Sequence, residues 1–353
     1  MCQILAELRP HLWVPYGSQM KKVKIYENND INEAITEINE DKADCNFGAA
    51  RERVVKLAKG APRDRDVLEY CRRFVKNRND KVAEEGYLRC LIQLDPNDSS
   101  LKRDRLELLQ VVDKADNRLF NLIETLMEQY NQNRSKTPEL TLQRKKAFKE
   151  LSIYNTLAIE GNTMTLDQVR TVINSTETLI PGHSQAEHEE VKGMMHVIEF
   201  IEKKKFSTKT IKLEDILKIH EYVLLDKPKK KGKLRDTEVA LTNVPFVPVP
   251  DAYVDEEMKK VVNFMHNKPE GMSGVEFSAL VSYAFVYVHP FADGNGRVSR
   301  LLMNMALEDY GYPPIIVPYC KRDKYYNSIY FGNMGDLRQF IRFIAKLLIA
   351  RLE

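Results

Sequence analysis

The sequence has few cysteines and little net charge, and each shortage excludes a class of function. Its five cysteines are widely spaced, with no C-x-x-C pair, so neither a zinc site nor a thiol-exchange motif is expected. The net charge is +3, from 54 basic and 51 acidic residues. Nucleic-acid binding usually needs a much larger excess of positive charge, and we therefore expect no nucleic-acid partner.

Long apolar runs are also missing from the sequence. No run approaches the roughly 20 apolar residues that a membrane helix needs. Near the N-terminus, Glu7, Arg9 and Pro10 stand where a signal peptide would need an unbroken apolar stretch. Taken as it stands, the sequence predicts a cytoplasmic protein.

The length of 353 residues is enough for a main domain and a smaller one. Residues 1–46 lack steady periodicity and are interpreted as an irregular lead-in. Pro62 and Pro96 lie 34 residues apart, which is the period of a tetratricopeptide helical hairpin. This spacing predicts tetratricopeptide-like repeats over residues 47–100, with a generic helical pair as the alternative. Apolar residues at the 3.6 period then predict a long linker helix over residues 101–136.

The remaining residues, 137–353, form the main domain, which is predicted to be all-α apart from one short hairpin. A basic loop runs from Lys227 to Lys233, and we interpret it as solvated. After it, residues 237–250 turn β-like and contain three prolines. These prolines confine the second arm of the predicted hairpin to a sheet edge.

The strongest functional pattern lies between two predicted helices. Ser273 and Glu276 form a capping box that starts the first helix, and Gly311 follows the second. The first amides of a helix have no internal partner and bind anions such as phosphate. The loop at this junction therefore predicts a phosphate site, and it reads His289-Pro290-Phe291-Ala292-Asp293-Gly294-Asn295-Gly296-Arg297-Val298-Ser299-Arg300.

The glycines and arginines of this loop suit the binding of phosphate. Gly294 and Gly296 let the backbone come close, and around Asn295 they can form a concave nest of N–H groups. Arg297 and Arg300 add forked positive charges. The stretch is not a P-loop, because no Lys-Ser or Lys-Thr follows the glycines.

His289 and Asp293 add the residue types that a transfer reaction needs. Asp293 supplies a hard oxygen ligand suited to Mg²⁺, which usually binds through one or two carboxylates and the phosphates of the substrate. The ordinary pKa of His289, about 6.5, suits a general base at neutral pH. Singly, each residue can be explained as a helix cap, a turn or a surface charge, but here they occur together.

The loop resembles the signature H-P-F-x-D/E-G-N-G-R-x-x-R of the Fic family, with every specified position filled and Ala292 in the variable slot. The resemblance extends over about residues 139–350. It implies an enzyme that transfers AMP from ATP to a Ser, Thr or Tyr hydroxyl of a protein and releases pyrophosphate. His289 would be the base, and Asp293 would bind Mg²⁺, with Mn²⁺ as the alternative ion.

The resemblance also implies which residues contact ATP. The hairpin is similar to the Fic flap, which holds a target segment by strand addition, although a purely structural hairpin is the alternative. Tyrosines at helical spacing are more often part of a core, which is the alternative for the two tyrosines among the implied contacts. The implied contacts are Val239, Ala240, Leu241, Thr242, Asp293, Gly294, Asn295, Gly296, Arg297, Val298, Ser299, Arg300, Tyr325, Tyr326 and Asn333.

A second motif predicts an inhibitory contact within the chain. Glu160 is expected at the end of a helix, because Gly161 follows it in the usual stop position and Thr165 with Gln168 forms the next capping box. The segment resembles the inhibitory motif S/T-x-x-x-E-G/N of Fic proteins, in which the Glu pairs with the last Arg of the signature. The resemblance implies a Glu160–Arg300 ion pair that inhibits AMP transfer, and a role of Glu160 in removing AMP from the target. A surface glutamate is the alternative.

Partner and compartment follow from the same resemblance. Metazoan members with a repeat unit act on a heat-shock chaperone in the endoplasmic reticulum, form homodimers and carry an N-terminal membrane anchor. No anchor is visible in this sequence, so the endoplasmic reticulum is the alternative to the cytoplasm. Two rival functions are a non-catalytic scaffold and the same fold transferring another group, such as UMP or phosphocholine.

Overall fold

The computed structural model describes residues 26–134, 138–175, 179–227, 229–239, 248–333 and 336–353. These residues form α-helices and two short 3-10 helices, and none of them is in a strand. The all-α prediction is confirmed. The centre of the predicted hairpin, residues 240–247, lies outside the described residues, and the flanking residues 237–239 and 248–250 are not in a strand.

The N-terminal unit consists of α2 (Asn28–Ala43), α3 (Phe47–Gly60), α4 (Arg65–Lys76) and α5 (Lys81–Leu94), each packed on the next. The prediction of an irregular lead-in was therefore wrong for residues 28–43. Ile31, Ala34, Ile35 and Ile38 recur at helical spacing and pack into the core of this unit, with Ile38 fully buried. This apolar stripe drives helix formation against α3. The tetratricopeptide assignment of residues 47–100 stays a prediction.

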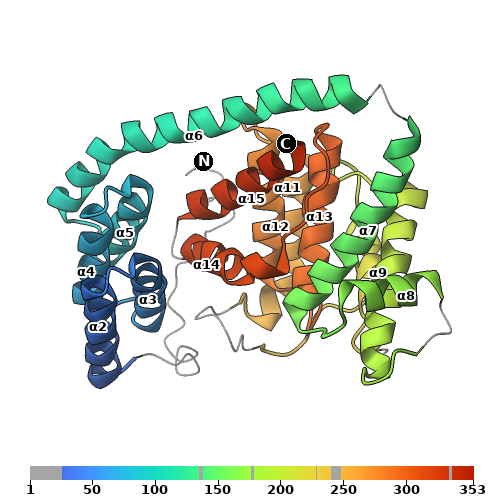
Figure 1. Ribbon diagram of the computed structural model, residues 1–353, viewed down its shortest axis with the longest axis horizontal. Coiled ribbons are helices and arrows are strands. Elements are labelled where there is room, and N and C mark those ends of the chain that lie inside the picture. The colour runs from blue at the N-terminus through green and yellow to red at the C-terminus, as the bar shows by residue number, and fades with distance from the viewer. Residues whose placement is uncertain (1–25, 135–137, 176–178, 228, 240–247, 334–335) are drawn as a thin grey trace.

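A single long helix, α6 (Ser99–Arg134), spans the molecule from the N-terminal unit to the rest of the chain (Figure 1). Leu101 is buried in the core of the N-terminal unit, and Ile123 is buried in the second core. Val111 and Leu122, two apolar residues of this helix, are 53% and 45% exposed. The predicted linker helix thus exists, but its packing partners and not its periodicity decide which face is covered.

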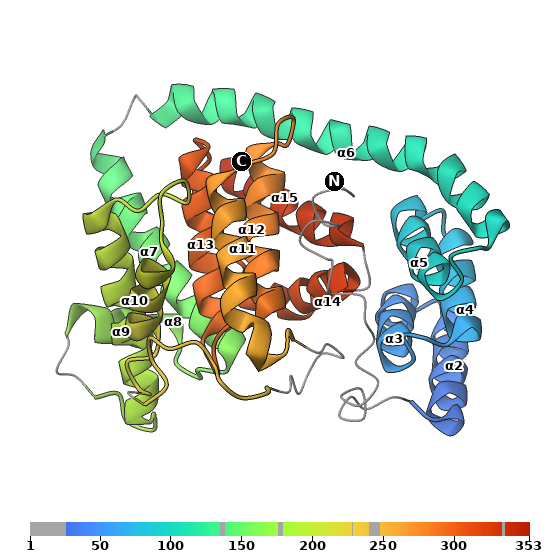
Figure 2. The ribbon, with the colours of Figure 1, turned by 180° about the vertical axis from the view of Figure 1, so that it is seen from behind.

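The second unit is a bundle of helices from α7 to α15. Its helices are α7 (Pro138–Glu160), α8 (Leu166–Asn174), α9 (Gln185–Lys204), α10 (Leu213–Val223), α11 (Val254–His266), α12 (Gly274–Val288), α13 (Asn295–Asp309), α14 (Arg322–Asn333) and α15 (Leu337–Leu352), with the 3-10 turns η2 (Asp251–Tyr253) and η3 (Tyr319–Lys321). Helix α12 is buried nearly all round and packs against α11, α13 and α15. Figures 1 and 2 show it inside the bundle from both sides. Among the described residues, no helix is both long and apolar enough to cross a membrane.

Candidate functional site

The predicted loop joins α12 to α13 and is shaped by two left-handed residues. His289 follows the last residue of α12 with φ 51°, and Gly294 precedes α13 with φ 80°. A side chain at Gly294 would also press on Val223 and His220, at 3.3 and 3.4 Å. Helix α13 then begins at Asn295, so its first amides face the loop, as the sequence predicts.

Two buried residues of the signature hold the loop in one conformation. Asn295 accepts a hydrogen bond from the amide of Phe291 at 2.9 Å and donates one to the carbonyl of Phe291 at 2.8 Å. The Phe291 ring is buried and stacks on His220, with ring centroids 3.6 Å apart and planes within 2°. These contacts give the loop one shape in advance of any ligand.

His220 is a functional residue that the sequence did not reveal. Its Nδ1 accepts the amide of Gly232 at 2.9 Å, which leaves Nε2 to donate to the carbonyl of Asp293 at 3.0 Å. Burial lowers the pKa of His220 to about 4, and the neutral ring makes both bonds. His220 therefore holds the loop in place from α10. Its only sequence signal is a histidine on an apolar helix face, which is more often a core residue.

His289, the predicted base, directly follows the last residue of α12. Its Nδ1 lies 3.3 Å from the carbonyl of Val286, which can only accept, so Nδ1 carries the proton and Nε2 has the free lone pair. Burial is the largest influence on His289 and lowers its pKa to about 4. At neutral pH the ring is uncharged and able to take a proton.

Arg235 is a second residue that the sequence did not reveal. It is buried, and its Nε donates to the carbonyl of His289 at 2.7 Å. The other nitrogens donate to the carbonyls of Thr237, at 3.2 Å, and Val249. The guanidinium of Arg235 thus links the two ends of the segment 237–249 to the backbone of His289, the predicted base. No motif marks Arg235 among the basic residues around it.

Asp293, the predicted metal ligand, has both oxygens engaged. Oδ1 accepts the amide of Gly294 at 2.6 Å and lies 3.3 Å from Arg297, and Oδ2 lies 2.6 Å from the ammonium of Lys227. Burial alone would raise the pKa of Asp293, but the hydrogen bond from Lys227 and the charge of Arg297 outweigh it and hold the pKa below its usual value. The interpretation of 227–233 as a solvated loop was therefore wrong for Lys227.

A Mg²⁺ ion fits Asp293 only in company with a phosphate ligand. Within the described residues, no cluster of three or more His, Cys, Asp or Glu side chains is present that would hold a metal by itself. An ionised carboxylate at the mouth of an anion-binding loop is the arrangement in which Mg²⁺ binds one side chain, substrate phosphates and water.

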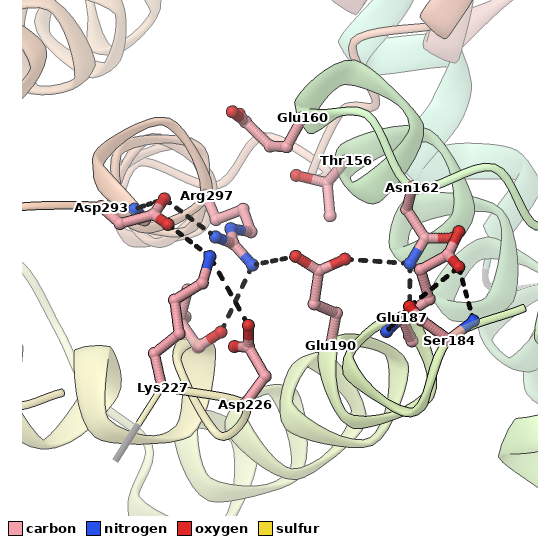
Figure 3. Close-up of polar contacts among 12 residues, drawn as sticks. Thr156, Glu160, Asn162, Ser184, Glu187, Glu190, Asp226, Lys227, Asp293 and Arg297 are labelled. Atoms are coloured by element: carbon pink, nitrogen blue, oxygen red, sulfur yellow. Dashed lines mark hydrogen bonds and ion pairs between the residues drawn. The ribbon is translucent and has the colours of Figure 1, made fainter. Parts of the chain in front are cut away.

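Arg297 lies inside the protein, between two carboxylates. Figure 3 shows its guanidinium between Asp293 and Glu190, and Glu190 in turn reaches Asn162. The separations are 3.3 Å from Arg297 to each carboxylate and 2.9 Å from Asn162 to Glu190. Burial raises the pKa of Glu190. Asn162 lies two residues after the end of the predicted inhibitory helix, so this chain of contacts joins that segment to the signature loop. The role of Arg297 at the phosphates stays a prediction.

The predicted contact between Glu160 and Arg300 is present. Helix α7 ends at Glu160, Gly161 has φ 105°, and Glu160 Oε1 lies 2.6 Å from Arg300. Arg300 also donates to the hydroxyl and the carbonyl of Thr156, at 2.8 and 3.1 Å. Burial lowers the pKa of Arg300, but the charge of Glu160 outweighs this and raises it. The glutamate is therefore not a simple surface residue.

The carboxylate of Glu160 also lies over the glycine of the phosphate loop. A Cβ at Gly296 would come within 2.5 Å of Glu160 Oε1 and 3.1 Å of Arg300. A side chain at this position would therefore displace the carboxylate of Glu160. The negative group of Glu160 occupies space beside the backbone that the sequence assigns to phosphate.

The other predicted ATP contacts lie in varied environments. Val298 and Ser299 are buried on α13, so only their backbone faces the loop. Tyr325 is buried against Phe340 and Phe343 as part of the core. Tyr326 is half-buried, and burial raises its pKa to about 12. The side chain of Asn333 accepts a hydrogen bond from Tyr283 at 2.9 Å, and Val239 is half-buried. Ala240, Leu241 and Thr242 lie outside the described residues.

Comparison with known proteins gives the same assignment along most of the chain. The model of the Fic/DOC family matches residues 210–307. Protein adenylyltransferase fic-1 of Caenorhabditis elegans is 34% identical over 291 residues, which is 81% of this chain and 56% of that protein. Protein adenylyltransferase Fic of Nematostella vectensis is 33% identical over 85% of this chain and 70% of its own length. The chain thus spans about half the length of the Caenorhabditis relative.

A solved structure extends the likeness to the whole fold. A fragment of Fic-1 from C. elegans superposes with a TM-score of 0.75 and 30% sequence identity, covering 91% of this chain and 96% of the fragment. The superposition therefore includes the N-terminal helices as well as the bundle that carries the loop. The chain belongs to the Fic/DOC family.

Proposed function

We propose that the protein is a protein adenylyltransferase, which transfers AMP from ATP to a Ser, Thr or Tyr hydroxyl of a target protein. The observation that carries the proposal is the loop from His289 to Arg300, in which a neutral, fixed histidine adjoins the free amides of α13. The relatives named above are called protein adenylyltransferases, which supports AMP as the transferred group.

In the proposed reaction, the hydroxyl oxygen of the target attacks the α-phosphorus of ATP, and the bond to the β-phosphate oxygen breaks. Pyrophosphate leaves, and Nε2 of His289 takes the hydroxyl proton. The amides at the start of α13 hold phosphate oxygens. A divalent cation bound by Asp293 and the phosphates would neutralise their charge.

The resting enzyme is proposed to be inhibited by Glu160. While Glu160 holds Arg300 at 2.6 Å, this arginine does not reach the γ-phosphate, and the carboxylate repels the phosphates that would lie beside Gly296. We propose that in this state the enzyme favours the opposing reaction, a hydrolysis in which water attacks the phosphorus of the attached AMP and releases AMP and the free hydroxyl of the target.

On the family resemblance, we propose a heat-shock chaperone as the target and a homodimer as the assembly. The endoplasmic reticulum, the cytoplasm being the alternative, is the compartment that such a target would imply. Mass spectrometry of the labelled target identifies its class, and sedimentation at several protein concentrations measures the assembly.

The test uses the Glu160→Gly protein with labelled ATP, Mg²⁺ and a cell extract. We expect a target to gain one AMP on a hydroxyl side chain, as measured by mass spectrometry. His289→Ala in the same background is the control and should give no product. Parallel incubations with UTP and a phosphocholine donor test the other groups. Product from one of these alone would refute AMP transfer, and no product from any donor would favour a scaffold.

A further inference from the structure

Lys227 has an unusual place for a lysine in a basic loop, because its ammonium lies between two carboxylates of the active site. Nζ is 2.6 Å from Asp293 Oδ2 and 3.5 Å from Asp226 Oδ2 (Figure 3). The Lys227 side chain is 38% exposed, whereas that of Asp226 is 3% exposed. A flexible cation therefore bridges a fixed, buried carboxylate and the predicted metal ligand.

The two oxygens of Asp293 differ in how firmly they are held. Oδ1 is bound by the backbone amide of Gly294 and by the buried guanidinium of Arg297. Neither of these donors can leave without a change in the loop. Oδ2 is bound by Lys227, whose four-carbon stem can rotate. A cation that binds Asp293 at Oδ2 must therefore displace the ammonium of Lys227.

Asp226 offers the displaced ammonium a place to go. Its Oδ1 is buried and has no hydrogen-bond partner among the described residues, and its Oδ2 already lies near Lys227. A buried carboxylate without a full set of partners favours a closer cation. Glu190 adds a third carboxylate to the cluster, and the cations that pair with these carboxylates in the described part of the chain are Lys227 and Arg297. This excess of negative charge favours the arrival of a further cation.

We propose that Lys227 is a positioning residue that occupies the metal-binding oxygen of Asp293 in the resting enzyme and moves to Asp226 when a divalent cation and a nucleotide bind. The inference rests on the proposed function. Lys227 holds the carboxylate of Asp293 in one orientation before the cation arrives, and the need to displace Lys227 weakens cation binding. Because the side chains of this ion pair are about one-third exposed, the cost is at most about 1 kcal/mol, or about fivefold in affinity.

The test measures the Kd of ATP by calorimetry, in Mg²⁺ and in EDTA, with all proteins in the Glu160→Gly background so that Arg300 is released. Lys227→Met should bind ATP about fivefold more tightly in Mg²⁺, without tighter binding in EDTA. Lys227→Arg keeps the charge and should not show the gain. Asp226→Asn should weaken binding in Mg²⁺, because the ammonium loses its second site. Lys230→Met, which removes an exposed lysine of the same loop, is the matched control.

The outcomes separate this inference from the proposed function. Unchanged ATP affinity of Lys227→Met in Mg²⁺ overturns the inference alone. Weaker binding of this variant in both media means that Lys227 contacts a phosphate, and this also overturns it. A gain of the same size in Lys230→Met would show a general charge effect and would overturn it as well. If no variant binds ATP in either medium, the proposed function fails, and the inference fails with it.

Discussion

Replacing Glu160 by glycine tests the ion pair at the centre of the site. Glu160→Gly removes the carboxylate that lies 2.6 Å from Arg300, but it leaves the two bonds from Arg300 to Thr156. Two effects of opposite sign are expected. The protein loses stability, because a buried guanidinium loses its counter-ion, and it gains AMP transfer, because Arg300 becomes free to bind phosphate.

The size of both effects follows from the burial of the pair. Removing one partner of a fully buried pair costs about 3–5 kcal/mol. Here the Glu160 side chain is 27% exposed and that of Arg300 only 7%. Allowing for this exposure and for the remaining bonds to Thr156, we expect a loss of about 2 kcal/mol in the free energy of unfolding. In a chain of 353 residues, that corresponds to a fall in Tm of about 3 °C.

The same free energy sets the gain in rate. In the wild type, Arg300 must break its ion pair with Glu160 before it can bind the γ-phosphate. The variant has no such ion pair to break. About 2 kcal/mol corresponds to about thirtyfold in the rate of AMP transfer. Removal of AMP from the modified target should be abolished in the variant, since we propose that Glu160 supports that reaction.

The assay follows label from ATP into the target protein, label released from the modified target, and thermal unfolding. Asp167→Asn is the control, because it removes a carboxylate whose side chain is 89% exposed, and it should change the stability by less than about 0.5 kcal/mol. A forward rate within about threefold of the wild type, together with the expected fall in Tm, would refute the inhibitory role. An unchanged Tm would instead refute the energetic importance of the pair.

Two further predictions concern the base and its support. Because burial lowers the pKa of His289 to about 4, the neutral ring that accepts a proton prevails above that pH. The kcat/KM for AMP transfer in the Glu160→Gly background should therefore stay level from pH 8 to about pH 5.5 and fall only below it. An acidic midpoint near the ordinary histidine value, about 6.5, would contradict the burial of this base. Arg235→Met should lower the free energy of unfolding, measured in urea, by about 3 kcal/mol, because the carbonyls of His289, Thr237 and Val249 lose a buried, charged donor. Lys233→Met, at an exposed position nearby, should change it by less than about 0.5 kcal/mol, and a similar loss in both variants would count against the role of Arg235.

The sequence by itself predicted the features that depend on neighbours along the chain. The capping boxes at Ser273 and Thr165 are both formed, and α7 ends at Glu160 as expected. Such features could be predicted because the side chain of an N-cap residue accepts a hydrogen bond from the amide three residues further on, and glycine is favoured where a helix stops. The pairing of Glu160 with Arg300 is a different case, because it came from the resemblance of two motifs to those of a family.

Only the tertiary structure showed the residues that hold the signature loop from other helices. His220 reaches Asp293 across 73 positions, Arg235 reaches His289 across 54, and Glu190 reaches Arg297 across 107. None of these pairs leaves a periodic or local pattern, and a lysine such as Lys227 is usually a solvated charge. The sequence predicted a phosphate-binding loop, and it determined that a helix begins at this loop. Packing of distant helices decided which charges surround the loop, because contacts between remote segments form only when their helices share a core.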